Sequence, residues 1–315
     1  MFLNVRSQNT SAHLALLIVA LIYAGNYLIA KVVMDGDYIK PLGFVLLRVI
    51  SGTTLFWLVS LFTVRERIHR SDWKFFVLCG LTGVAANQSL FFSGLDLTTP
   101  IHASLIMTVS PMLVLVFSYL ILKEHITGRK VTGIFVGCAG AVTLMTLGKE
   151  VMTGSQYLVG DLMIFLNATS YALYLVLVKR LIRQYAPLTV IKWVFSAGLI
   201  FVFPLGIGQM LQIDWQTFQF TTWLAVAYVL LCVTFLAYLL NIFALKRVSP
   251  NTVSIYIYLQ PLFASVLSVI FTGEEISLIK LVSGVLIFSG VYLVSSSGVS
   301  GAKPVSQGPK NRPNN

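Results

Sequence analysis

Ten long apolar runs dominate this chain of 315 residues. The hydrocarbon core of a bilayer is roughly 30 Å thick, and a helix needs roughly 20 residues to cross it. Because hydrocarbon offers no water to backbone polar groups, runs of this length without strand alternation are predicted to be helices. The runs cover residues 12–34, 42–63, 73–95, 103–122, 131–147, 158–179, 190–211, 222–245, 252–271 and 278–295.

The composition excludes a soluble fold. Hydrophobic residues make up 57% of the chain and charged residues only 10%, whereas soluble domains carry about 45–50% and about 25%. Intrinsic disorder and a nucleic-acid-binding domain are excluded on the same ground. The three cysteines lie inside apolar runs, so neither a disulfide framework nor a CxxC metal site is predicted, and no cofactor is expected.

The Lys and Arg residues predict the orientation of the chain in the membrane. Seventeen of the 22 fall in alternate loops and at the two ends of the chain, and only Lys40, Lys149 and Lys280 fall in the remaining loops. Because cytoplasmic loops are enriched in Lys and Arg, both termini are expected in the cytoplasm of a cell whose inner membrane holds the protein. Residues 1–11 form the cytoplasmic N-terminus, and residues 297–315, rich in Ser, Gly, Pro and Asn, are predicted to be a disordered cytoplasmic tail.

The chain repeats itself at a shift of 150 residues. The segment from Leu95 to Gly140 aligns with the segment from Leu245 to Gly290, including Pro111 on Pro261. Residues 12–150 and 151–296 are therefore predicted to be two homologous halves of five helices each. Because five is odd, the second half must enter the membrane from the opposite side, which is the inverted repeat of many secondary transporters.

These repeated segments resemble a known family. GLDLTTPIHASLIMTVSPMLVLVFSYLILKEHI (94–126) and ALKRVSPNTVSIYIYLQPLFASVLSVIFTGEEI (244–276) are similar to the duplicated signature of ten-helix EamA-type carriers in the drug/metabolite transporter superfamily. The resemblance also includes YAGNYLIAK (23–31) and Arg48 early in the second helix. It implies transport of a small metabolite or drug, often efflux of amino acids.

Polar and aromatic side chains at helical spacing predict a substrate site inside the membrane. Buried amides need partners, and aromatic walls with a few polar groups are typical of small-ligand sites. Interhelical hydrogen bonding is the alternative role for each of them. The candidate residues are Tyr23, Asn26, Asn87, Gln88, Ser104, Asn167, Tyr171, Tyr174, Tyr238, Asn241, Tyr258 and Gln260.

Two kinds of residue within the runs carry more specific hypotheses. Arg48 lies inside the second run, where its guanidinium could bind a substrate carboxylate through two hydrogen bonds; pairing with Asp35, Asp37 or Asp96 is the alternative. Pro111 and Pro261 lie at matching positions, where each removes a helical hydrogen bond. They are predicted to form a hinge or gate, with a structural kink as the alternative.

The ionisable residues limit the mechanism. No Asp or Glu lies in the interior of a run, so a carboxylate proton relay has no candidate. His102 opens the fourth run and could titrate near neutral pH, either at the substrate site or as an inert residue at the membrane edge. Motifs of nucleotide, metalloprotease and serine-hydrolase chemistry are absent from the sequence.

The sequence as a whole predicts an all-α membrane protein that is not an enzyme. It is expected to be a secondary transporter that moves a small metabolite or drug by alternating access, with efflux as the expected direction. A passive facilitator is the alternative within transport, and a membrane-embedded enzyme or a non-transporting scaffold are the alternatives outside it. The bilayer and a small-molecule substrate are the expected partners, and the sequence does not decide between a monomer and a homodimer.

Overall fold

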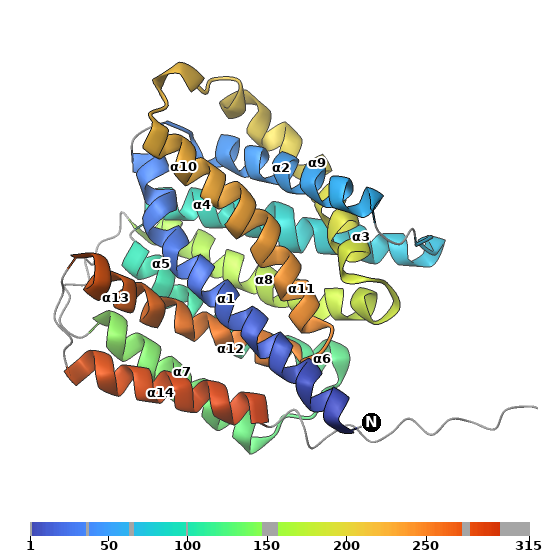
Figure 1. The fold of residues 1–315 in the computed structure, drawn as a ribbon, viewed down its shortest axis with the longest axis vertical. Coiled ribbons are helices and arrows are strands. Elements are labelled where there is room, and N and C mark those ends of the chain that lie inside the picture. Colours follow the sequence, from blue (N-terminus) through green and yellow to red (C-terminus); the bar gives the residue numbers. More distant parts are fainter. Residues whose placement is uncertain are drawn as a thin grey trace, which may run out of the picture.

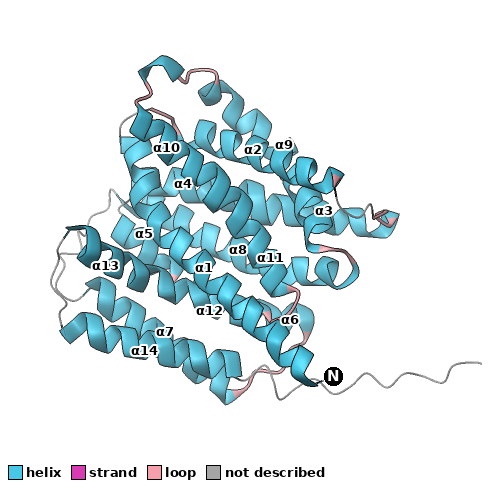
Figure 2. Cartoon of the chain, in the orientation of Figure 1, coloured by secondary structure: helices cyan, strands magenta, loops and turns pink. Residues whose placement is uncertain are grey.

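The described part of the chain is helical throughout. The computed structural model describes residues 2–35, 38–62, 66–98, 100–146, 157–272 and 278–296, and all the regular secondary structure in these ranges is helix (Figure 2). Six helices are long and apolar enough to cross a membrane, and Thr10–Asn26 and Leu281–Ser296 are shorter apolar helices. The six are Pro41–Leu61, Arg70–Leu97, Ala103–Leu122, Leu158–Gln184, Pro187–Met210 and Phe220–Leu245. The predicted all-helical membrane architecture is confirmed, while the number ten and the inversion of the halves stay predictions.

The helices follow the predicted runs closely. The first half contains α1 (Phe2–Asp35), α2 (Pro41–Leu61), α3 (Trp73–Gly80), α4 (Asn87–Leu97), α5 (Pro100–Met107), α6 (Ser110–Leu122) and α7 (Gly128–Thr146). The second half contains α8 (Leu158–Gln184), α9 (Pro187–Met210), α10 (Phe220–Tyr228), α11 (Ala237–Leu245), α12 (Pro250–Ile255), α13 (Leu259–Thr272) and α14 (Leu278–Ser296). Several begin at a proline, whose missing N–H costs nothing in the first turn of a helix.

The two halves pack against each other in a reciprocal way. Figure 1 shows α2 beside α9 along one edge of the bundle and α7 beside α14 along the opposite edge. Between these edges, α1 of the first half packs against α11 and α13 of the second, while α8 of the second half packs against α4 and α6 of the first. These main contacts therefore all join the two halves.

Glycines set the close approach of α7 and α14. A Cβ on Gly290 would lie 2.6 Å from the carbonyl oxygen of Gly133 and 2.6 Å from the amide nitrogen of Gly137. Small residues of this kind allow helix backbones to touch inside a membrane. These glycines are thus buried between the two halves of the chain.

Four irregularities interrupt the inner helices at related positions. A π-helical turn, Leu81–Ala86, separates α3 from α4, and a second one, Val229–Leu236, separates α10 from α11. The helix of α5 and α6 breaks at residues 108–109, and that of α12 and α13 passes through a 3₁₀ turn, Tyr256–Tyr258. Adding 150 to residues 81–86 gives positions inside the second π-turn. Adding 150 to residue 108 gives a position inside the 3₁₀ turn. The breaks lie a few residues before Pro111 and Pro261, whose role as a hinge or gate stays a prediction, whereas the π-turns had no sequence signal.

Candidate functional site

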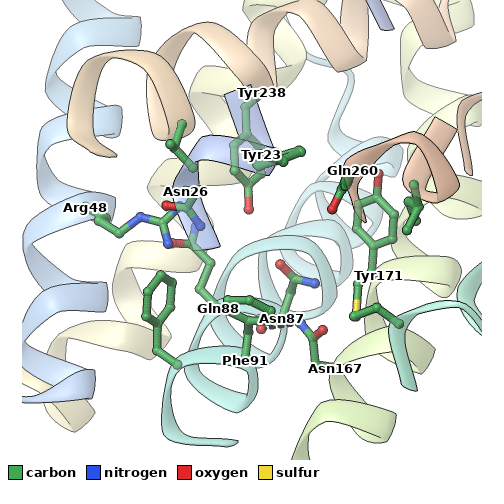
Figure 3. Close-up of a pocket in the computed structure, with 14 residues that line it drawn as sticks. Tyr23, Asn26, Arg48, Asn87, Gln88, Phe91, Asn167, Tyr171, Tyr238 and Gln260 are labelled. Atoms are coloured by element: carbon green, nitrogen blue, oxygen red, sulfur yellow. Dashed lines mark hydrogen bonds between the residues drawn. The ribbon is translucent and has the colours of Figure 1, made fainter. Parts of the chain in front are cut away.

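A cavity of about 90 Å³ lies where the two halves meet (Figure 3). Polar residues come from α1, α2, α4, α8, α11 and α13, so both halves contribute. Nine of the predicted candidates line it: Tyr23, Asn26, Arg48, Asn87, Gln88, Asn167, Tyr171, Tyr238 and Gln260. The apolar part of the lining consists of Phe91, Phe92, Met107, Val233 and Ile257. The cavity has the composition of a small-molecule site, with apolar walls and a few convergent polar groups.

Arg48 supplies the only charge among the described lining residues. Its side chain is 4% exposed, Nε donates to Thr234 Oγ1 at 2.9 Å, and the guanidinium carbon lies 4.6 Å from the centre of the Phe92 ring. A guanidinium has five N–H donors, and Figure 3 shows it extending from α2 toward the cavity. A buried charge is costly without compensation. The arrangement therefore favours an acceptor group of a ligand beside Arg48.

No carboxylate of the described part of the chain forms an ion pair with Arg48. Of the three acidic partners considered from the sequence, Asp37 lies outside the described residues and the side chain of Asp35 is not described. Asp96 is exposed at the end of α4. The structure thus places Arg48 against a hydroxyl and an aromatic ring, both from other helices.

Carbonyl groups at the first π-turn are bonded by side chains of the second half. Ser170 donates to the Thr82 carbonyl at 2.8 Å, and Tyr238 lies 3.4 Å from the Gly83 carbonyl. Asn167 Nδ2 donates to the Asn87 carbonyl at 2.6 Å. A π-turn disturbs the regular helical hydrogen bonds and is frequent at functional sites. Here it lets α8 and α11 attach to the first half beside the cavity.

Three amide oxygens of the cavity wall are left without a hydrogen bond. Asn26 Oδ1, Gln88 Oε1 and Asn167 Oδ1 are buried, and none has a partner among the described residues. An unpaired buried acceptor costs about 1–3 kcal/mol. Proteins retain such groups where a ligand can pair with them, so these oxygens are candidates to accept from a bound N–H or ammonium group.

The remaining candidates lie elsewhere. Asn241 lines a smaller neighbouring cavity that shares Tyr23, Tyr171 and Gln260 with the main one. Ser104 is half-buried on α5 and is not among the lining residues, and the side chain of His102 is not described. Pro111 and Pro261 follow the helix breaks described above.

Tyr174 and Tyr258 differ from the prediction that they line the site. Both are buried, and neither reaches the cavity. The Tyr174 ring packs against Gly83, where a Cβ would lie 2.2 Å from it. The Tyr258 hydroxyl donates to the carbonyl of Thr108 at 2.9 Å. Helical spacing predicts inward faces for both residues, but their side chains contact neighbouring helices and are not among the lining residues.

Sequence reasoning missed the apolar lining residues. Phe91 and Phe92 follow Gln88 by about one helical turn, so their face could have been found from spacing alone. Met107 and Ile257 occupy matching positions of the repeat, one residue before Thr108 and Tyr258. The repeat could therefore have been used to predict that both residues line the same cavity.

The profile of the EamA-like transporter family matches the chain twice, over residues 10–146 and 158–296. The chain belongs to the EamA-like transporter family. An uncharacterized transporter of Archaeoglobus fulgidus is 25% identical over 291 residues, which cover 91% of this chain and 98% of the relative. A probable terminal-alkyne amino-acid exporter of Streptantibioticus cattleyicolor is 25% identical over 281 residues, covering 89% of this chain and 92% of the relative.

This EamA-like transporter also shares its fold with a solved crystal structure. The two match with a TM-score of 0.73 and 20% sequence identity, over 92% of this chain and 98% of the other. Family membership identifies a multi-pass membrane protein of a transporter family, with a bilayer around it and a small molecule as its substrate. Each of the two family matches covers about half of the chain.

Proposed function

We propose that this EamA-like transporter is a secondary carrier that exports a small metabolite, an amino acid or a related compound, or a drug across the inner membrane. Its two halves, residues 12–150 and 151–296, are inverted repeats of five helices that alternate access to the cavity between them. Both termini lie in the cytoplasm. The substrate carries a carboxylate that Arg48 binds.

One observation carries this proposal: among the described residues, one buried cation and three unpaired amide oxygens line one cavity between the halves. Arg48 can donate two parallel N–H bonds to a carboxylate. Asn26 Oδ1 and Asn167 Oδ1 can accept from an ammonium group, and Phe91 and Tyr171 provide an apolar and aromatic wall. An α-amino acid presents these complementary groups together.

The reciprocal packing supports alternating access. In carriers built from inverted repeats, the substrate lies near the middle of the membrane between the repeats, and interrupted helices border it. Here the breaks before Pro111 and Pro261 occupy matching positions on either side of the cavity. The Streptantibioticus relative, a probable terminal-alkyne amino-acid exporter, supports both the substrate class and the direction.

A passive facilitator is the second candidate. No Asp or Glu lines the cavity among the described residues, so the proton relay of many coupled carriers has no carboxylate there. A facilitator would exchange substrate at a rate that a pH gradient leaves unchanged.

Counterflow in proteoliposomes tests the proposal. Vesicles preloaded with one unlabelled compound from a panel of amino acids, organic acids and nucleobases receive the labelled compound outside, with and without a pH gradient. Exchange of amino acids but not of their decarboxylated amines is expected. Absence of exchange for every compound, with protein that is folded by size-exclusion chromatography, would contradict a carrier function.

Arg48→Gln tests the carboxylate anchor. Hydrogen bonds to charged groups contribute roughly 1.5–3 kcal/mol, so exchange at low substrate concentration is expected to fall by about tenfold or more. Arg129→Gln is the control, because Arg129 is exposed outside the cavity and the substitution removes the same charge. Equal exchange by wild type and Arg48→Gln would overturn the role of Arg48.

A further inference from the structure

Tyr258 connects the two interrupted helices at their breaks. Its hydroxyl donates to the Thr108 carbonyl at 2.9 Å, and both residues are buried. Thr108 lies in the break between α5 and α6, and Tyr258 lies in the 3₁₀ turn between α12 and α13. A shift of 150 residues places Thr108 on Tyr258, so the bond joins equivalent positions of the two halves.

The acceptor exists because the helix is broken there. In a continuous helix the N–H of Met112 would donate to the Thr108 carbonyl, but it donates instead to the Val109 carbonyl at 3.0 Å. Pro111 has no N–H to offer. The Thr108 carbonyl is therefore released from the helix, and the Tyr258 hydroxyl satisfies it.

The backbone of α7 restricts the position of the Tyr258 ring. A Cβ on Gly137 of α7 would lie 2.6 Å from the ring, so the ring lies directly on the backbone of α7. The side chain is 0% exposed. Because the ring is held in place, its hydroxyl points to one acceptor. A backbone displacement at one break is therefore transmitted through this hydrogen bond to the other break.

The cavity reaches both ends of this connection. Met107 and Ile257, the residues directly before Thr108 and Tyr258, line the cavity from the two halves. A bound molecule that contacts both residues is in contact with the helices next to both breaks at the same time.

We propose that Tyr258 is a positioning residue that couples the two helix breaks, so that α5–α6 and α12–α13 bend together when the cavity is occupied or emptied. The inference rests on the proposed carrier function for its role in the transport cycle. The coupling itself is a property of the folded protein and can be measured without a substrate.

Hydrogen–deuterium exchange of the purified chain in lipid nanodiscs tests the connection. In Tyr258→Phe, amides in peptides covering 105–113 are expected to exchange about fivefold faster, because a hydrogen bond contributes about 1 kcal/mol. Tyr174→Phe is the matched control for this measurement, since its hydroxyl is buried and has no partner among the described residues. Equal exchange in the two variants would overturn the proposal.

A second substitution tests whether a change at one break reaches the other. Pro111→Ala restores an N–H to the first break, and amides in peptides covering 253–262 are expected to change their exchange by about threefold. In the double variant with Tyr258→Phe this distant change should disappear. Transmission of the same size in both backgrounds would show that the hydroxyl does not couple the breaks, whether or not Pro111→Ala lowers stability.

Counterflow separates this inference from the proposed function. With a substrate identified by the panel, Tyr258→Phe is expected to lower the maximal exchange rate about fivefold while the half-saturating concentration stays within about twofold. A change in half-saturation alone would contradict a positioning role. Coupled hydrogen exchange without any transport would instead contradict the carrier function and leave the coupling in place.

Discussion

The edge formed by α7 and α14 and the helices around the cavity solve the same packing problem differently. At the edge, two uninterrupted helices touch through glycines, and Gly290 lies against the backbone of Gly133 and Gly137. Around the cavity, π-turns and breaks release carbonyls that side chains of the other half then bond. At the edge, regular helical backbone allows close contact between the helices. At the centre, the helices are interrupted, and backbone carbonyl groups are exposed to hydrogen bonding by side chains. The difference sets a closely packed apolar edge against a polar centre with interrupted helices.

Adding one methyl group to the edge should have the largest effect. In Gly290→Ala the new Cβ would lie 2.6 Å from two backbone atoms that cannot rotate away. A loss of about 2–3 kcal/mol is expected, measured as a lower thermal midpoint and a smaller folded fraction by size-exclusion chromatography. Gly208→Ala is the control, because, apart from its own helix and chain neighbours, no atom of the described residues lies within 4 Å of a Cβ at this position. Similar midpoints for the two variants would mean that the glycine contact does not hold this edge.

Removing a polar group from the centre should have the opposite effect on stability. Asn26 is 6% exposed and its Oδ1 has no partner among the described residues. In Asn26→Leu the thermal midpoint is expected to rise, reflecting about 1 kcal/mol, because an unpaired buried amide is replaced by an apolar group. Counterflow should fall at the same time, as in other trade-offs between stability and function. If Asn26→Leu were less stable than wild type and still transported at the normal rate, the unpaired amide would have no role in transport.

The smallest effect is expected at the residue that orients Arg48. Thr234 Oγ1 accepts from Arg48 Nε at 2.9 Å and donates to the Val229 carbonyl at 2.9 Å. Thr234→Val keeps the shape and removes both bonds, so the half-saturating substrate concentration should rise about fivefold.

Thr53→Val is the matched control for this change. The Thr53 hydroxyl is buried and has no partner among the described residues, so its removal should leave half-saturation unchanged. If both variants behaved alike, the hydroxyl of Thr234 would have no part in placing the guanidinium.

Much of the candidate site could be predicted from residue type and spacing. Asn26, Arg48 and Asn167 are costly in a membrane, and such residues are retained where they have partners or a ligand. The structure brings these three to one cavity. Spacing failed for Tyr174 and Tyr258, because a helical face specifies a direction but not what lies in that direction. Tyr174 packs against Gly83 and Tyr258 packs against Gly137, and these contacts are visible only after the helices pack.

The sequence by itself determined the membrane environment, the helical class and the repeat of 150 residues, because these depend on hydropathy and on similarity within the chain. It also located the helix breaks, since proline removes a hydrogen bond wherever it stands. Only the tertiary structure decided the π-turns, the apolar cavity wall and the bond from Tyr258 to Thr108. Each of these depends on which helix meets which, and the contacts that decide this join residues far apart in the chain, such as Thr108 and Tyr258, which are 150 positions apart.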